Sequence, residues 1–454
     1  MDSTVMCRPP TANGPPTSAL SARGPHPVPT VRPLIFQGLE SLFTDPAITT
    51  RPFPVLWPHS HAIANHFTIG HSSFHYSSSS TLNSRVLSGC APEKVIHPST
   101  TLDQTRLTLE FFQDVLRKSK IKHDHVQYPD VVNPPTLLLV LCDLIIGIDE
   151  KKFNDDESAE IVSFLERAFA RLEAWFQWLY TSQKGKKEGS FYWRGRDSTT
   201  DQELNPRTVA SGMDDYPRAS HPSDDEMHVD LRCWIYLAAD CMKFITTFLQ
   251  RKKTEEDYSS IVHQLSDFDD LNKMHYDRDH KTYLDFGNHA EKVRLVIEFG
   301  RGIRVTDEEP ELKKVPRVGY ASLFPFMSKI IPPHSEILEQ QLDLISSNEL
   351  VCSDYGLLSL AKTSSLYMTP NALMNQPPCW RGPIWMNINY MILASLKHYS
   401  SVEGPYSDKA RDIYVKLRNN LIRIPSENSE GFPRKEEIPR NYFPRTCFVG
   451  MSSE

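Results

Sequence analysis

The stretch SGMDDYPRASHPSDDEMHVDLRCW, Ser211 to Trp234, decides how the rest of the chain is interpreted, because it concentrates acidic groups beside a predicted helix start. Its six carboxylates are Asp214, Asp215, Asp224, Asp225, Glu226 and Asp230. Ser223 followed three residues later by Glu226 is a capping-box pattern, which predicts a helix from Glu226 to about residue 250. In that helix Glu226 and Asp230 would lie one turn apart on the same face.

The same helix start would place Asp224 and Asp225 in the first turn, where the helix dipole favours negative charge. Asp214 would lie on the Gly/Asp/Pro loop that precedes the helix. A loop acid beside two stacked carboxylates is typical of acid–base catalysis on a polar substrate. The alternatives are that Asp214 and Asp215 are ordinary turn residues and that Glu226 only closes the capping box.

Asp230 lies inside the predicted helix and needs a partner for its charge. Either it pairs with a cation such as Arg232, or it contacts a ligand hydroxyl. His221 and His228 are interpreted as loop or helix histidines rather than metal ligands, because no HExxH or comparable spacing accompanies them.

Composition excludes several classes of function. The 454 residues carry a net charge of −7, from 50 basic and 57 acidic side chains. This balance gives no basic footprint for nucleic acid and no polybasic run for anionic lipid. The 8 cysteines form no CxxC pair, and GxGxxG, P-loop and GxSxG motifs are absent, so we expect neither a metal nor another cofactor.

No segment of this sequence is predicted to span a membrane. The most apolar run, Thr136 to Ile148, is too short to span a bilayer and contains Asp143, so it is predicted to be a core helix. The N-terminus lacks the apolar segment of a secretory signal.

Proline content and periodicity divide the chain into three parts. Residues 1–101 are proline-rich without a hydrophobic period, which predicts a disordered segment. Residues 102–424 show helical periodicity, clearest from Glu157 to Thr181. Residues 425–454 form a polar, proline-broken tail.

Other predicted elements between residues 102 and 424 are mostly helices. They cover residues 107–116, 136–148, 258–271, 321–331, 337–345, 384–399 and 406–424, with a short extended pair at 280–295. This order predicts an all-α architecture of stacked helical hairpins.

Two WRG segments favour carbohydrate binding. They are Tyr192-Trp193-Arg194-Gly195-Arg196 and Cys379-Trp380-Arg381-Gly382-Pro383-Ile384-Trp385. Aromatic rings cover the C–H faces of sugars, and guanidinium groups hold their hydroxyls. The alternative for either segment alone is a Trp–Arg stack within the core.

Several of these motifs resemble those of a known family. SGMDDYPRASHP and EMHVDLRCW are similar to segments of the processing α-glucosidase I family, the mannosyl-oligosaccharide glucosidases of glycoside hydrolase family 63. Further similar segments, in family order from about residue 126 to 423 and closest to the plant members, are NPPT at 133–136, YWRGRD at 192–197, DFGNH at 285–289, GYASLFPF at 319–326, DYGLLSLAKTSS at 354–365 and WRGPIWMNINY at 380–390.

The resemblance implies an (α/α)6 toroid and an inverting hydrolase. Such an enzyme removes the outermost α-1,2-linked glucose from the triglucosylated N-glycan precursor in the endoplasmic reticulum, so the implied partner is a glucosylated high-mannose N-glycan on a nascent glycoprotein. Asp214 matches the family's general acid. The positions that match substrate-binding or cleft-lining residues are Glu226, His228, Asp230, Trp234, Arg194, Arg381 and Trp385.

The sequence departs from the family pattern at both ends. The family's membrane anchor, β-rich domain and WDEGFH element are not found, and neither is the Trp-Glu-x-Tyr motif whose Glu activates water. Cys379 stands where the family has tyrosine. We therefore expect a sequence truncated at both ends, an incomplete toroid and no general base, so that the chain would turn over little substrate. The alternatives are a glycan-binding pseudoenzyme, a non-folding fragment and, less favoured, a trehalase-like hydrolase.

Overall fold

The computed structural model describes residues 130–372 and 377–427. The predicted disordered segment at 1–101, the predicted helix at 107–116 and most of the predicted tail at 425–454 lie outside the described residues. The last described helix continues to Glu427, beyond the predicted helix end at residue 424.

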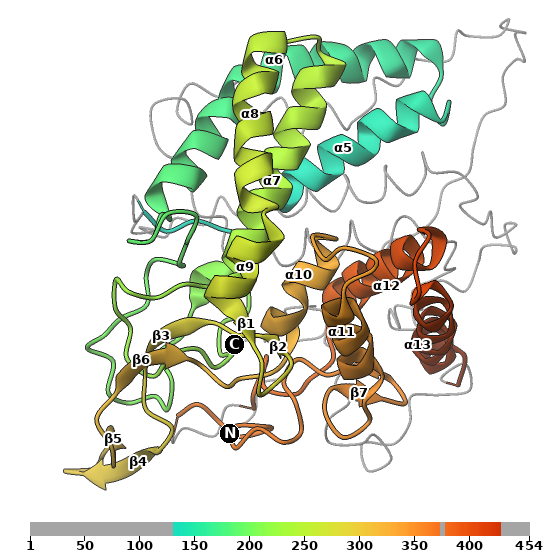
Figure 1. Cartoon of the computed structure of the whole chain (residues 1–454). Helices are drawn as coiled ribbons and strands as arrows, with labels where there is room; N and C mark the ends of the chain where they lie inside the picture. Colours follow the sequence, from blue (N-terminus) through green and yellow to red (C-terminus); the bar gives the residue numbers. More distant parts are fainter. Residues whose placement is uncertain (1–129, 373–376, 428–454) are drawn as a thin grey trace, which may run out of the picture.

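Four long helices form one side of the molecule (Figure 1). They are α5 (Thr136–Asp149), α6 (Asp155–Ser182), α7 (Val229–Phe248) and α8 (Lys252–Leu265). The predictions of α5 and α6 are confirmed. The local sequence explains both the start and the orientation of α6. Asn154 and Glu157 form a complete capping box, and the apolar face of the helix is buried in the core. α7 packs against α5, α6 and α8 and so lies at the centre of this group.

A second group of helices lies beyond the N-terminal end of α7 (Figure 1). Its members are η2 (Tyr320–Leu323), α10 (Phe324–Met327), α11 (Glu336–Ser346), α12 (Met386–Ser401) and α13 (Ser407–Glu427). α9 (Phe268–His275) follows α8 toward this group. α10 packs against both α7 and α12, and Trp234 of α7 meets Phe324 of α10 edge to face with ring centroids 5.4 Å apart. One hydrophobic core therefore runs through both groups.

Short antiparallel strand pairs complete the fold, in addition to the helices that the all-α prediction anticipated. The pairs are β1 (Tyr276–Asp277) with β2 (Thr282–Tyr283), β3 (Phe286–His289) with β6 (Glu311–Lys314), β4 (Val293–Glu298) with β5 (Arg301–Thr306), and β7 (Cys352–Ser353) with β8 (Gly356–Leu357). The predicted extended chain at 280–295 is present, but its strands pair with β1, β5 and β6 rather than with each other.

The predicted start of α7 is wrong. The helix begins at Val229, and its N-cap, His228, has extended backbone angles and no side-chain cap. Met227 instead exchanges backbone hydrogen bonds with Phe286, at 2.8 and 2.9 Å. This pairing holds the backbone extended through residue 227, so Glu226 does not close a capping box. Asp224 and Asp225 consequently lie on the preceding loop and not in the first turn.

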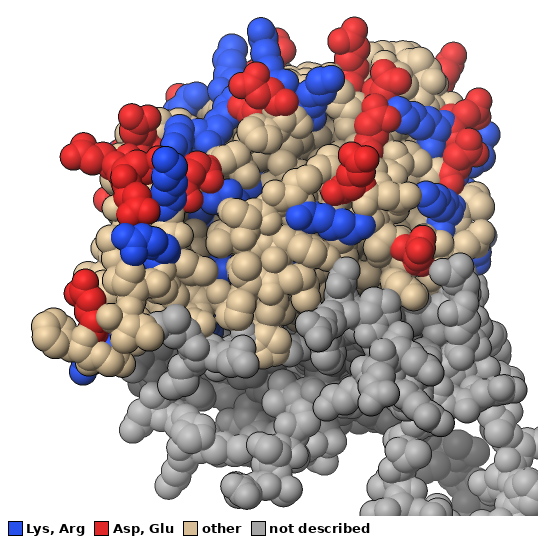
Figure 2. Space-filling view, turned by 90° about the horizontal axis from the view of Figure 1, so that it is seen from below, with Lys and Arg blue, Asp and Glu red and all other residues tan. Residues whose placement is uncertain are grey.

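The surface of the described part carries both signs of charge. On the face seen in Figure 2, lysine and arginine side chains are interspersed with aspartate and glutamate. Among the described helices, none combines the length and apolarity that a membrane span requires.

Candidate active site

The loop that carries Asp214 is fixed by local hydrogen bonds. It follows the short η1 helix (Val209–Ser211) and turns at Gly212, whose φ of 76° lies in the left-handed region. Thr208 N–H donates to the backbone oxygen of Asp214 at 2.8 Å, and Met213 N–H donates to Ser211 Oγ at 3.1 Å. The half-buried Asp214 side chain is thus carried on a defined backbone.

Asp215 clamps this loop to the second WRG segment. Its carboxylate accepts the backbone N–H groups of Cys379, at 2.9 Å, and Trp380, at 2.7 Å. In return Arg381 Nε donates to the backbone oxygen of Asp215 at 2.8 Å. Three hydrogen bonds therefore join two segments that are more than 160 positions apart in the sequence, and the residue next to the predicted acid supplies all three acceptors.

The clamped segment presents paired indole rings. Trp380 and Trp385 stack with ring centroids 4.0 Å apart and planes inclined by 5°. Trp385 Nε1 donates to the backbone oxygen of Cys379 at 2.7 Å, and the Trp385 backbone N–H donates to the Tyr320 hydroxyl at 3.0 Å. The rings are almost fully buried, so they support the segment from inside the protein.

Arg381 is buried between the two segments. Besides Asp215 it contacts the side-chain oxygen of Asn371. Burial lowers the pKa of Arg381 to about 10, an effect that the charge of Asp215 partly offsets. The guanidinium remains positively charged at neutral pH and holds the loops together.

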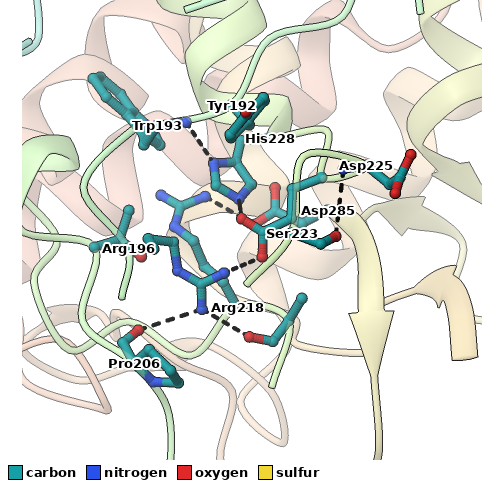
Figure 3. Close-up of polar contacts among 12 residues, drawn as sticks. Tyr192, Trp193, Arg196, Pro206, Arg218, Ser223, Asp225, His228 and Asp285 are labelled. Atoms are coloured by element: carbon teal, nitrogen blue, oxygen red, sulfur yellow. Dashed lines mark hydrogen bonds and ion pairs between the residues drawn. The ribbon is translucent and has the colours of Figure 1, made fainter. Parts of the chain in front are cut away.

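Glu226 lies in a different buried cluster, with Arg196 and His228, and these two partners are labelled in Figure 3. Its carboxylate pairs with Arg196 and lies 3.2 Å from His228 Nε2. The other imidazole nitrogen of His228 accepts the backbone N–H of Trp193 at 3.0 Å, which leaves Nε2 as the proton-bearing nitrogen in a neutral ring. Burial alone would raise the pKa of Glu226, but Arg196 and His228 hold this pKa below its ordinary value.

Asp230 belongs to a third set of contacts, within α7. Its two oxygens accept both terminal nitrogens of Arg218, at 2.9 and 2.6 Å, and Trp193 Nε1 donates to it at 3.1 Å. Arg218 also binds Asp285 at 2.8 Å. Burial opposes ionisation of Asp230, yet Arg218 lowers the pKa of Asp230 below its ordinary value. The partner expected from the sequence, Arg232, is wrong: Arg232 reaches Asp270 instead.

The other predicted contact residues lie within the protein framework. Arg194 stacks on Tyr192, with Cζ 3.8 Å from the ring centroid, and donates to backbone oxygens of Ser182 and Lys184 at 3.0 and 2.9 Å. Trp234 packs on Phe324 as described above. The structure therefore brings Asp214, Arg381 and Trp385 to one set of loops, while Arg194, Glu226 and Asp230 lie in networks of their own.

Three charged residues of these networks escaped the sequence analysis as site residues: Arg196, Arg218 and Asp285. The sequence held a signal for the two arginines, because a carboxylate that is buried requires a cation as its partner. Arg196 belongs to YWRGRD and Arg218 to SGMDDYPR, both of which stand out in the sequence. Their pairing with Glu226 and Asp230 depends on the path of irregular loops, which no periodicity reveals.

Metal binding finds no support in the described ranges. Within residues 130–372 and 377–427, no three or more His, Cys, Asp or Glu side chains are grouped so that they could hold an ion.

Comparison with known proteins defines the class to which this site belongs. Residues 114–430 match the C-terminal domain of glycosyl hydrolase family 63, and the chain belongs to that family. The most informative relatives are plant glucosidases. The chain is 60% identical to alpha-glucosidase 2 of Arabidopsis thaliana and 59% identical to the mannosyl-oligosaccharide glucosidase GCS1 of the same plant, over 67% of this chain in both cases. It spans only 40% and 37% of the lengths of these two relatives.

More distant similarities were also found. A probable mannosyl-oligosaccharide glucosidase of Schizosaccharomyces pombe is 31% identical over 68% of this chain and 39% of its own length. Among solved structures, a GH63 mannosylglycerate hydrolase of Thermus thermophilus in complex with glucose is 14% identical, with a TM-score of 0.44 over 68% of this chain and 71% of the other.

Proposed function

We propose that this chain contributes the proton-donating half of a mannosyl-oligosaccharide glucosidase site. The substrate is the glucosylated high-mannose N-glycan of nascent glycoproteins, and the bond is that of the terminal α-1,2-linked glucose. The observation that carries the proposal is the clamp between Asp215 and the Cys379–Arg381 segment, because it brings the loop of the proposed acid to the tryptophan-bearing segment.

In this proposal the Asp214 carboxyl donates its proton to the glycosidic oxygen as the bond to the glucose C1 breaks. A water molecule adds to C1 from the opposite face of the ring, as inversion requires. Trp385 and Arg381, which are almost fully buried, support the loops around the glucose subsite. No residue is assigned as the base that takes the proton from this water.

Glu226 and Asp230 take a different role in the proposal from the direct sugar contact that the resemblance implied. Both side chains are almost fully buried, with 1% and 0% of their surface exposed, and their charges are already balanced by arginines. We assign them to positioning the loops that carry Arg196 and Arg218. Arg194 and Trp234 hold neighbouring segments in the same way.

The family relationship also supports the coarser parts of the proposal. The helical hairpins would belong to an (α/α)6 toroid, whose loops converge at one end, and the site of action would be the endoplasmic reticulum. Both features come from the glucosidase assignment and stand or fall with it.

The experiment compares the unmodified chain with two variants. Asp214→Asn removes the proposed acid, and Asp225→Asn is a control that changes an exposed ion pair with Lys186. Triglucosylated glycan is added, and proton NMR follows the anomeric signal of released glucose. Release of glucose as the β-anomer, at whatever rate, that is lost in Asp214→Asn and retained in the control is the result that supports the proposal.

Two other outcomes separate the alternatives. Glycan binding without release, unchanged in Asp214→Asn, supports the glycan-binding pseudoenzyme. Neither binding nor release by a chain that is folded by circular dichroism overturns the proposed function.

A further inference from the structure

A cavity of about 550 Å³ lies beside the clamped loops. Its volume falls within the range of small-molecule sites. The start of β4 and the loops near residues 204 and 369 form its walls. The lining residues used below are Leu204, Asn205, His289, Glu291, Arg317 and Thr369. Asp214, Trp380 and Trp385 are not among the described residues that line it, so this cavity is distinct from the proposed glucose subsite.

The charges around the cavity are balanced. Arg317, whose side chain is only 8% exposed, lies 3.0 Å from Glu291, and Glu291 is also 2.9 Å from His289 Nε2. Burial raises the pKa of Glu291, but His289 and Arg317 outweigh that effect and bring this pKa to about 2, so the carboxylate is charged. Burial lowers the pKa of His289, which leaves the imidazole neutral near pH 7. Arg317 and Glu291 therefore neutralise each other, and Arg294, which also lines the cavity, pairs with Asp307 at 3.1 Å, so each of these lining arginines has a carboxylate partner.

The remaining walls mix apolar and polar groups. Leu204, Val293, Leu366 and Pro370 supply carbon surface, while the polar groups of Asn205, Ser220 and Thr369 lie in the wall and hydrogen-bond within the protein. Sugars present the same mixture, with C–H faces and many hydroxyls that both donate and accept hydrogen bonds. Arginine–carboxylate pairs provide donors and acceptors in fixed geometry for such hydroxyls.

Hydrogen bonds link the cavity wall to the loop of Asp214. Asn371, between the lining residues Pro370 and Ala372, donates to the backbone oxygen of Asn205 at 2.9 Å and accepts Leu204 N–H at 2.7 Å. The side-chain oxygen of Asn371 accepts Arg381, which in turn holds Asp215. A ligand in the cavity would therefore contact the same framework that positions the proposed acid.

We propose that this cavity binds the glucose-free part of the oligosaccharide, a neutral branch that lies beyond the bond to be cleaved. The inference rests on the proposed function, because it identifies the cavity as a second subsite for the same substrate. It predicts that recognition extends from the terminal glucose, beside Asp214, to the high-mannose portion, beside Arg317.

The test uses two probes that report on the two places separately. A free high-mannose glycan without glucose probes the cavity, and kojibiose, two glucoses joined α-1,2, probes the region of Asp214. Calorimetric titration of the full chain with each probe gives both dissociation constants.

The key variant is Thr369→Trp, which fills the cavity without removing a buried charge. Its matched control is Thr363→Trp, an exposed position on the same segment that does not line the cavity. We expect Thr369→Trp to weaken binding of the glucose-free glycan by at least about tenfold, which corresponds to about 1.4 kcal/mol. Thr363→Trp and kojibiose binding should be unchanged. Arg317→Gln, checked for folding by circular dichroism, should weaken the same glycan.

The two proposals fail in different ways. If the unmodified chain does not bind the glucose-free glycan, or if Thr369→Trp binds it as tightly as Thr363→Trp does, the cavity inference is overturned. If kojibiose does not bind while the glucose-free glycan binds in a Thr369-dependent manner, glycan binding by the cavity stands, but the glucosidase assignment is overturned and with it the role of the cavity as a subsite of that enzyme.

Discussion

At the scale of single residues, burial and ion pairing separate side chains that the sequence places together. Glu226 and Asp230 are four positions apart, yet one pairs with Arg196 and the other with Arg218. The difference arises because Met227 belongs to a strand pairing and Asp230 to a helix. Spacing in the sequence predicted a shared face that the backbone between them does not allow.

Removing the Asp230 carboxylate should be costly for the folded state. Asp230→Ala leaves the fully buried Arg218 with Asp285 as its remaining ion-pair partner within the described residues. We expect a loss of about 3–5 kcal/mol in the free energy of unfolding, the range for breaking a buried ion pair. Urea denaturation followed by far-UV circular dichroism measures this loss.

The control for that measurement is Asp225→Ala on the preceding loop. Asp225 pairs with Lys186 at 2.8 Å, but their side chains are 41% and 62% exposed. Such a pair contributes about 0–1 kcal/mol. Similar small losses in both variants would show that the Arg218–Asp230 pair does not stabilise the fold.

The residue scale also shows how far the candidate site could be predicted. The acid loop and both WRG segments were found because they concentrate carboxylates, arginines and aromatic rings in short stretches. The clamp by Asp215 was not predicted, because its acceptors reach backbone N–H groups of Cys379 and Trp380. Any residue supplies such a group, so nothing in the sequence marks it.

At the scale of elements, length decided which predictions were confirmed. α6 presents a whole apolar face over many turns, and its cap is written in adjacent residues. By contrast α10 covers only Phe324–Met327 and β1 only Tyr276–Asp277. Segments this short contain fewer than two periods of a helical or strand hydrophobic pattern, so their structure depends on the tertiary contacts around them.

The end of α9 should make stability depend on pH. His275 is fully buried, and its Nδ1 lies 3.0 Å from the backbone oxygen of Leu284. Burial, assisted by the charge of Arg232, lowers the pKa of His275 to about 3. In the unfolded chain this histidine takes up a proton below about pH 6.5, whereas in the folded chain it stays neutral until about pH 3.

The sign of the effect follows from that difference. As pH falls from about 6.5 toward 3, the unfolded chain gains a proton that the folded chain cannot bind, so the free energy of unfolding falls. One such group contributes a slope of up to about 1.4 kcal/mol per pH unit. Urea midpoints measured from pH 7 to pH 5 give the slope above the range in which carboxylates such as Glu226 protonate.

The variant His275→Gln should reduce this slope, whatever its effect on absolute stability. His289 is also buried with a lowered pKa, so part of the slope should remain. His263→Gln on α8, an exposed position, serves as the control and should leave the slope unchanged. Equal slopes in the unmodified chain and in His275→Gln would contradict the prediction.

At the scale of the whole molecule, the two helix groups share one core. Most buried apolar side chains from Val132 to Leu421 belong to one cluster, while Leu358 and Ile384 form a small second one. Trp234 and Phe324 meet where the groups join. Among the described residues, the exposed large apolar side chains are Ile146, Val209, Ile297, Phe299, Leu312, Met386 and Val415. Phe299 and Ile297 lie on the β4–β5 hairpin, and the others are spread over separate elements.

This continuity opposes the non-folding-fragment hypothesis and predicts one cooperative unfolding transition. The full chain should unfold with coincident changes in far-UV circular dichroism, which reports on the helices of both groups, and in tryptophan fluorescence. Binding of a hydrophobic dye should remain low until the transition, because apolar surface becomes available only when the shared core opens.

Shortening a side chain at the junction tests whether the shared core couples the unfolding of the two helix groups. Trp234→Ala should cost about 3–5 kcal/mol, the range for deleting a buried aromatic ring, and should shift both signals together. Val415→Ala on α13, where the side chain is 49% exposed, should change stability by no more than about 0.5 kcal/mol. A gradual melt of the unmodified chain with dye bound from the outset would instead show that the two groups do not form a stable unit. Separate transitions in Trp234→Ala would show that this contact is what makes them cooperative.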